Sequence, residues 1–369
     1  MPNSKSNDRP GVQKLVDSST SDRINARKLV DSSSRREVQE VQLSSWIVFT
    51  GSNQPNEHWE LPSPPSWRPR QANRRIAEEQ DSTRQPILSA TTLSGSRYKT
   101  DSHISRLVNA AIHLRRPLLI SGGPGSGKST LINCVAHELC LGEPLRWPIT
   151  SKSTLKDGLY NYDAIGRFQR DEKTSSENSV GSYVELGPLG TSMLPCLRPR
   201  ALLIDEIDKG DADLPNDLLN VLEDARFHMP ELSRAAESTS TVRLFGGQHQ
   251  VPVTSGQVLS YEFPFVVMTS NGEREFPAAF LRRCLQLRMP DPYADPERLE
   301  AIVRAHLGTT VATKAAAEIS AFVERAKAGE VLATDQLLNA IQIVMGGYSL
   351  SSDDRNTLVK ALISDLGRQ

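Results

Sequence analysis

The sequence has few cysteines and no export or membrane signal. Four cysteines occur in 369 residues, and their spacing matches no metal-ligand pattern. No run approaches the roughly 18 apolar residues of a membrane-spanning helix, and the polar N-terminus lacks the apolar core of a secretory signal. These absences argue against a disulfide framework and predict a soluble, cytoplasmic protein whose thiols are reduced: Cys134, Cys140, Cys196 and Cys284.

The chain also lacks an excess of charge of either sign. Its 43 basic and 44 acidic residues give a formal net charge of −1. Such a balance gives no global reason to expect a nucleic acid or an anionic membrane as partner. The hydrophobic fraction of 38% is sufficient for one large or two medium domains.

Residues 1–98 differ in composition from the rest of the chain. They are polar and rich in serine and proline, and we expect most of this region to be disordered. KLVDSS occurs at 14–19 and 28–33, which favours a local duplication, with a short interaction motif as the alternative. The tryptophan- and proline-rich segment 44–69 is expected to dock, either on the rest of the chain or on a partner.

From about residue 99 the pattern becomes α/β. Short apolar runs alternate with helical patterns, which predicts a parallel sheet covered by helices on both faces within 99–290. After Pro290 only helical patterns remain, and they predict an all-helical subdomain over 291–369. The apolar runs lie at 115–122, 145–150, 201–206, 265–271 and 284–289, and the C-terminal helical patterns at 295–307, 312–328, 334–345 and 352–366.

GGPGSGKST, at 122–130, follows the first apolar run and opens a helical pattern. This is the context of the phosphate-binding loop G-x-x-x-x-G-K-[ST]. Lys128 is expected to reach the β- and γ-phosphates of ATP, and the Ser129 hydroxyl to bind Mg²⁺. The predicted nucleotide-binding residues are Gly122, Gly123, Pro124, Gly125, Ser126, Gly127, Lys128, Ser129 and Thr130.

ALLIDEID, at 201–208, delivers two carboxylates to the end of a buried strand. Adjacent acids there are costly without a cation, and a magnesium ion resolves this. We therefore assign Asp205 to the metal and Glu206 to activating the attacking water. Together with the phosphate loop, this pair predicts a nucleoside triphosphatase.

TSNGEREFPAAFLRRC, at 269–284, gives the chain a resemblance to the AAA+ ATPases over roughly residues 100–369. The resemblance implies that Asn271 is the sensor that orients the attacking water. It also implies that Arg283 is the arginine finger acting on a neighbouring subunit's nucleotide, with Arg282 as the alternative. The fold expected is then a P-loop NTPase sheet (AAA+ core) with an all-α lid, in a ring expected to be a hexamer.

A finer resemblance is to the MoxR-like and dynein-related branch. It rests on two segments that resemble the hairpin insertions of this branch, 155–199 and 242–256. The chain departs from the family at 333–342, where Gln336 stands and the usual lid arginine is missing. Either the lid couples weakly to ATP, which favours slow hydrolysis, or another cation takes the place of this arginine.

The MoxR resemblance implies an ATPase that remodels or activates a protein partner, often one with a von Willebrand A-type domain. A slow nucleotide-sensing switch in bacterial defence or signalling is one alternative. A nucleic-acid motor is another, although YVELGPLG carries Glu185 and no cation where a basic loop is expected.

Overall fold

The computed structural model describes residues 46–170, 179–235, 237–247, 249–291, 296–345 and 351–364. The described residues from Val48 onward belong to one compact unit. The predictions for residues 1–45, the KLVDSS repeat among them, lie outside the described residues.

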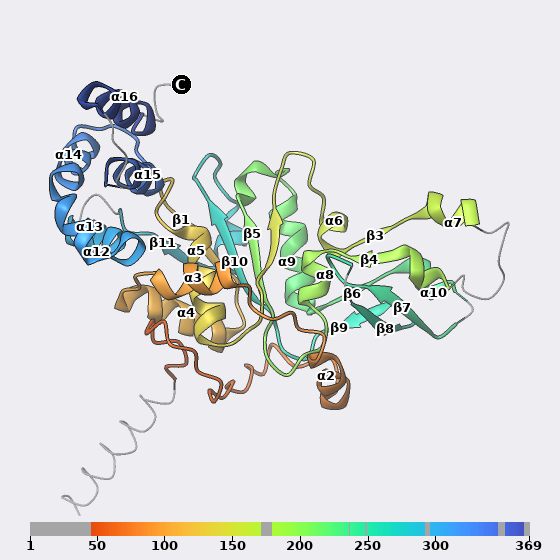
Figure 1. Ribbon diagram of the computed structural model, residues 1–369. Coiled ribbons are helices and arrows are strands. Elements are labelled where there is room, and N and C mark those ends of the chain that lie inside the picture. The colour runs from red at the N-terminus through yellow and green to blue at the C-terminus, as the bar shows by residue number, and fades with distance from the viewer. Residues whose placement is uncertain are drawn as a thin grey trace, which may run out of the picture. The chain divides into compact units, whose positions relative to one another are not determined.

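A five-stranded parallel sheet forms the centre of the α/β part and confirms the predicted fold class. Its strand order is β11-β1-β10-β5-β2, and every pair of neighbours is parallel (Figure 1). Each strand comes from one of the five predicted apolar runs. The bounds are β1 Leu118–Ser121, β2 Leu145–Pro148, β5 Ala201–Asp205, β10 Phe265–Ser270 and β11 Leu285–Arg288.

Two apolar cores cover the two faces of this sheet, because successive side chains of a strand point to opposite faces. In β5, Leu202 and Ile204 face one core, and Ala201 and Leu203 face the other. A strand buried on both faces must be apolar throughout, as these are. One core includes α8 (Pro188–Ser192) and α9 (Leu214–Asp224); the other includes α4 (Ser102–Leu114) and α5 (Lys128–Glu138).

A second sheet unites the two predicted hairpin segments. The hairpin of β7 and β8 turns at Gly246 and Gly247, whose φ values of 83° and 70° suit glycine. The pairing of β6 with β9 was not predicted, because strands of three residues give little periodic signal. The sheet order is β3-β4-β7-β8-β9-β6, with bounds β3 Tyr160–Tyr162, β4 Val184–Leu186, β6 Arg226–His228, β7 Thr239–Arg243, β8 Gln250–Thr254 and β9 Gln257–Leu259.

Short helical elements connect these strands. Among them, α7 carries the chain away from β3, and Figure 1 shows it at the outer end of the β3–β4 insert. These connecting elements are α6 Leu155–Leu159, α7 Ala164–Arg170, η1 Val180–Tyr183, η2 Ile207–Lys209, α10 Pro230–Ser233 and α11 Ala278–Leu281.

Residues 48–59, here named the N-terminal strap, pack on α4 and α5. The Asn109 side chain accepts hydrogen bonds from the backbone N–H groups of Val48 (2.6 Å) and Phe49 (2.9 Å). Residues 47–50 form no strand, and a side chain takes the N–H groups that strand pairing would use. Trp59 is buried and donates from Nε1 to the carbonyl of Leu139 at 2.8 Å. At Trp59, the predicted docking is thus on the chain's own α/β part.

Glu138, at the end of α5, is a second residue that binds the strap through hydrogen bonds. Its buried carboxylate accepts the backbone N–H groups of Thr50 (2.6 Å) and Asn53 (3.1 Å), and the Thr50 hydroxyl at 2.8 Å. Ordered structure therefore begins well before residue 99. Two helices follow the strap, α2 Arg74–Asp81 and α3 Ser89–Arg97.

The C-terminal helices, blue in Figure 1, enclose a core of their own and confirm the predicted all-helical part. The pattern at 312–328 forms two helices instead of one, because the chain bends at Ala315, whose methyl group is fully buried. The bounds are α12 Pro296–Leu307, α13 Thr309–Lys314, α14 Ala316–Lys327, α15 Thr334–Met345 and α16 Ser352–Leu362.

All four cysteines carry free thiols. Burial raises the pKa of the Cys134 and Cys284 thiols to about 12, so both behave as packing groups. Across the described ranges, no helix is both long enough and apolar enough to cross a membrane.

Candidate nucleotide and metal site

The loop between β1 and α5 leaves a helix N-terminus open to an anion. Gly127 precedes α5 with φ 85°, and no side chain caps the first turn. Unpaired N–H groups and the helix dipole make such a terminus suited to phosphate. Gly125 has φ 68°, and a Cβ there would lie 2.5 Å from the backbone nitrogen of Thr334. The loop therefore needs glycine both for its backbone and for its contact with α15.

Lys128 is folded back on this loop. Its Nζ donates to the carbonyls of Gly122 (2.8 Å) and Gly123 (2.9 Å), and the residue is buried. Burial lowers the pKa of the ammonium, while Asp205 and other nearby carboxylates oppose that shift. The charge is thus held beside the open helix terminus.

Asp205 lies at the end of β5, within reach of two hydroxyls. Ser129 Oγ donates to Asp205 Oδ1 at 2.8 Å, and Thr269 Oγ1 donates to the same oxygen. A carboxylate beside a hydroxyl is a donor set that fits Mg²⁺, which takes few protein ligands and completes its shell with phosphate and water. In the described part of the chain, no cluster of three or more His, Cys, Asp or Glu side chains forms a complete metal cage.

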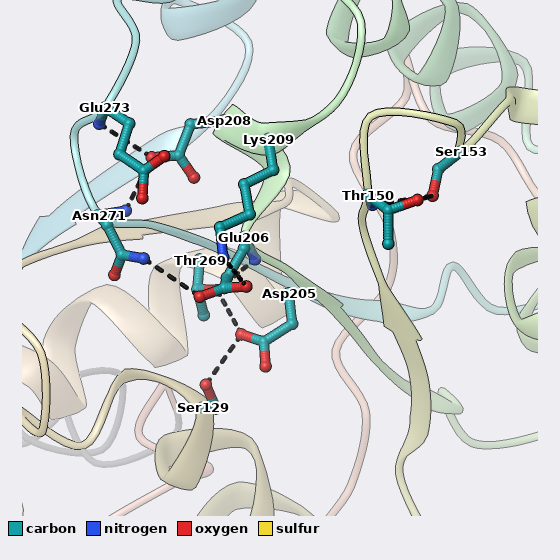
Figure 2. Close-up of polar contacts among 10 residues, drawn as sticks. All are labelled: Ser129, Thr150, Ser153, Asp205, Glu206, Asp208, Lys209, Thr269, Asn271 and Glu273. Carbon is teal, nitrogen blue, oxygen red and sulfur yellow. Dashed lines mark hydrogen bonds and ion pairs between the residues drawn. The ribbon is translucent and has the colours of Figure 1, made fainter.

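Glu206 contacts three side chains, those of Thr269, Asn271 and Lys209, as Figure 2 shows. Its backbone is left-handed (φ 59°), and its N–H donates to Thr269 Oγ1 at 2.9 Å. The carboxylate accepts from Asn271 Nδ2 at 3.2 Å and pairs with Lys209 Nζ at 2.8 Å. The hydrogen bond that Lys209 donates to Glu206 raises the pKa of the Lys209 ammonium. A non-glycine residue in this conformation is strained, which is typical of functional sites.

Asp208 positions the chain that follows β10. Its buried Oδ2 accepts the N–H groups of Asn271 and Glu273, both at 3.0 Å, so it fixes where the Asn271 amide points. Sequence reasoning missed Thr269, Asp208 and Lys209. A detectable signal was present for the first two, because Thr269 is polar within a buried strand and Asp208 stands two residues after Glu206.

A cavity of about 310 Å³ opens beside the phosphate loop. Gln336 does not line it: its side chain accepts from Ala333 N and donates to Ser364 O, both at 2.9 Å. The C-terminal helices instead contribute Ile302, His306, Thr334, Asp335 and Leu338, and the end of α3 and the residues after it contribute Ser94, Arg97, Tyr98 and Lys99.

Arg283 stands apart from this cluster. It precedes β11, and β11 pairs with β1 in parallel from Leu118↔Leu285 onward, so Arg283 lies at the amino-terminal edge of the sheet. Its Nε pairs with Glu223 Oε1 of α9 at 2.8 Å, and both side chains are about one third exposed (32% and 35%). Arg282 is exposed, and its carbonyl accepts from Arg116.

The structure therefore brings together Lys128, Ser129, Asp205, Glu206 and Asn271, and leaves both arginines at the far edge.

Residues 117–264 match the family model described as AAA domain (dynein-related subfamily). This segment is an AAA+ domain. The chain is also 25% identical over 178 residues to Midasin from Giardia intestinalis. That match covers 48% of this chain and 3% of Midasin.

Solved structures similar to the chain include NtrX from Brucella abortus in complex with ADP and a mutant of RuvB from Thermotoga maritima. The first is 12% identical, covers 79% of this chain and 56% of that one, and has a TM-score of 0.35. The second is 13% identical, covers 72% and 71%, and has a TM-score of 0.39. Because both TM-scores are low, these similarities carry no argument about the fold, and the fold is described by its own strand order.

Proposed function

We propose that the chain binds ATP with Mg²⁺ and hydrolyses it in a ring-shaped oligomer, expected to be a hexamer, to remodel a protein partner as MoxR-like ATPases do. The observation that carries the proposal is the cluster beside the phosphate loop. There, the Ser129 hydroxyl and the Asp205 carboxylate lie within hydrogen-bond distance and offer two oxygen ligands for Mg²⁺. Next to them, the Asn271 amide orients Glu206 through a hydrogen bond.

Each side chain of the cluster has a distinct task in this proposal. Lys128 and the free N–H groups of α5 bind the phosphates. Ser129 and Asp205 would hold Mg²⁺, which neutralises phosphate charge when bound. Glu206 accepts the proton of the attacking water, and Asn271 orients that water; both lie within hydrogen-bond distance of each other (3.2 Å).

The position of Arg283 supports a ring. The finger cannot act on its own subunit's nucleotide, since Arg283 and Glu206 lie at opposite edges of the same sheet. In the proposed ring it leaves Glu223 and reaches the phosphate held by the next subunit.

The partner-contacting element proposed here is α7. Ile165 is 72% exposed and Phe168 is 82% exposed, and at a spacing of three they share one face of the helix. An exposed apolar pair at the end of an insert favours contact with another protein. A protein with a von Willebrand A-type domain is the partner that the MoxR resemblance suggests.

A slow nucleotide-sensing switch is the second candidate. The observation that favours it is the contribution of the C-terminal helices to the cavity: Thr334 and Asp335 lie there in place of an arginine, and Gln336 turns to Ser364. Among the described residues that line the cavity, these helices contribute no arginine or lysine, so turnover is expected to be low.

One experiment separates these functions. The ATPase rate per subunit is measured against protein concentration, with Mg²⁺ or EDTA, and with or without DNA or RNA. A rate that rises with concentration and needs Mg²⁺ is expected, because the site is shared between subunits. A rate independent of concentration contradicts the ring, strong stimulation by nucleic acid favours a motor, and ATP-dependent assembly with minimal turnover favours the switch.

A further inference from the structure

A second cavity, of about 230 Å³, lies at the amino-terminal ends of β2 and β5. It shares no lining residue with the cavity beside the phosphate loop. Arg200 directly precedes β5, and Asp205 ends it, so about 16 Å of strand separates the two sites at roughly 3.3 Å per residue. The function proposed above uses none of its residues.

Arg200 is the feature that distinguishes this cavity. The residue is only 6% exposed, and its Nη2 donates to the neutral hydroxyl of Thr83 at 2.6 Å. Among the described residues, none accepts from its buried Nε, and no carboxylate lies within 4.0 Å of its guanidinium. A buried cation without an anionic partner is costly, and a bound anion would remove that cost.

Two more guanidinium groups line the same cavity. Arg146 is exposed and, among the described residues, makes one hydrogen bond, from Nη2 to the Asn133 amide oxygen at 2.7 Å, so most of its donors stay open to a ligand. Arg84 adds charge, although its donors are engaged by the carbonyls of residues 141, 198 and 199 and by Asp81.

One carboxylate also lines the cavity, that of Glu143. Its two oxygens accept from Leu88 N (3.0 Å) and from the Thr91 hydroxyl (2.8 Å), so it is directed to the start of α3. Three arginines and one glutamate leave the lining with an excess of positive charge.

The remaining wall is apolar. Phe245, in the β7–β8 turn, is 39% exposed, and its backbone N–H is fixed by the Thr191 hydroxyl at 3.1 Å. Leu141, Leu145 and Leu244 continue this wall. The volume is below the roughly 300–1,000 Å³ typical of sites for drug-sized molecules, so the ligand should be smaller than a nucleotide.

We propose that this cavity binds a small organic anion, with one phosphate or carboxylate group held by Arg200 and Arg146 and a compact apolar body against Phe245. Guanidinium groups match both anionic groups in geometry. The site is a second ligand site of the AAA+ domain, remote from its nucleotide.

Calorimetric titration of the full chain tests this proposal with three probes of one shape: phenyl phosphate, benzoate and uncharged benzyl alcohol. We expect at least one anion to bind and benzyl alcohol not to bind. The Lys128→Ala variant, which disables the phosphate loop, should bind the anion as the wild type does. Arg200→Gln should weaken binding about 10-fold or more, and Arg146→Gln about 5-fold, as lost charged hydrogen bonds do.

Arg75→Gln is the matched control, because Arg75 is exposed on α2 and pairs with Glu79 of the same helix; the anion should bind this variant as it binds the wild type. Binding that is lost in Lys128→Ala but kept in Arg200→Gln overturns the proposal, since the anion then occupies the phosphate loop. Failure of both anions to bind the wild type also overturns it. If Arg200→Gln does not fold, the exposed Arg146 decides the question through its own variant.

Discussion

The two edges of the parallel sheet in the AAA+ domain differ in chemistry. At the carboxyl ends of the strands, carboxylates and hydroxyls lie close together (Figure 2), and the charges of Asp205 and its neighbours act on Lys128. At the amino ends, arginines stand before three strands: Arg116 before β1, Arg200 before β5 and Arg283 before β11. One edge thus suits a metal with its phosphates, and the other suits anions or a neighbouring subunit.

A single strand of this sheet therefore joins a metal and phosphate site at its carboxyl end to an anion site or subunit contact at its amino end. The apolar interior of β5 contributes only packing, while Arg200 and Asp205 at its ends carry charges of opposite sign. The chemistry at one end can therefore be tested separately from the chemistry at the other. The following changes test each edge separately.

The largest effect is expected at the amino edge. Arg283→Ala should keep ATP binding and lower turnover by about 10³-fold or more, as removal of a finger does in GTPases. The measurement is steady-state ATPase activity beside nucleotide affinity. Glu223→Gln is the control: it breaks the ion pair but keeps the finger, so turnover should persist. Turnover in Arg283→Ala equal to that of the wild type, with Arg282→Ala inactive, would transfer the role to Arg282.

At the carboxyl edge, Glu206→Gln should lower turnover by about 10²- to 10⁴-fold, because the amide cannot accept a proton from water. ATP affinity should be retained, as measured by equilibrium binding. Lys209→Met, which removes only the ion-pair partner of Glu206, should keep more activity than Glu206→Gln. Equal losses in both variants would show that the ion pair, and not the base, is essential.

A smaller effect is expected from Thr269→Val, which has nearly the same shape. It removes the hydroxyl that bonds both Asp205 and the Glu206 backbone, so the Mg²⁺ concentration for half-maximal activity should rise by about 10-fold, as the loss of one charged hydrogen bond allows. Ser270→Ala, at the adjacent position, is the control and should leave that concentration unchanged. An unchanged Mg²⁺ requirement in Thr269→Val would separate this threonine from the metal site.

The smallest effect is expected from Glu138→Gln, beneath the strap. Replacing the carboxylate weakens charged hydrogen bonds to Thr50 and Asn53, which should lower the free energy of unfolding by about 1–3 kcal/mol. Urea denaturation measures this change, and ATP affinity should stay as in the wild type. Lost affinity with unchanged stability would mean that the strap acts on the phosphate loop at the other end of α5.

The sequence was informative wherever a feature is local. The wholly apolar runs that became β1, β5 and β10 could be predicted, because a strand buried on both faces admits no alternation. The cap of α4 is another local feature: the Asp101 side chain, directly before the helix, accepts from Ile104 N, as an aspartate at that position commonly does. Ser129 and Asp205 were assigned to one metal from their two motifs, each at the end of an apolar run, and the structure places them 2.8 Å apart.

Features that depend on distant pairing could not be predicted. The strap contacts α4 and α5 across 60 to 88 residues, and a polar segment gives no periodic signal of such a contact. Thr269 was missed because a threonine in a strand is ordinary until its hydroxyl is seen against Asp205. The ion pair of Arg283 with Glu223 joins two elements, and adjacent arginines at a helix end give no hint of that partner.

The strap also bears on where the folding unit can be cut. A fragment that starts near residue 99 would lose the partners of Glu138 and Asn109, and would uncover the surface of α5 on which α3 packs through Gly95, close to the carbonyl of Asn133. The newly exposed apolar surface favours aggregation. For this AAA+ domain, the shortest fragment that should fold and stay in solution begins no later than Val48.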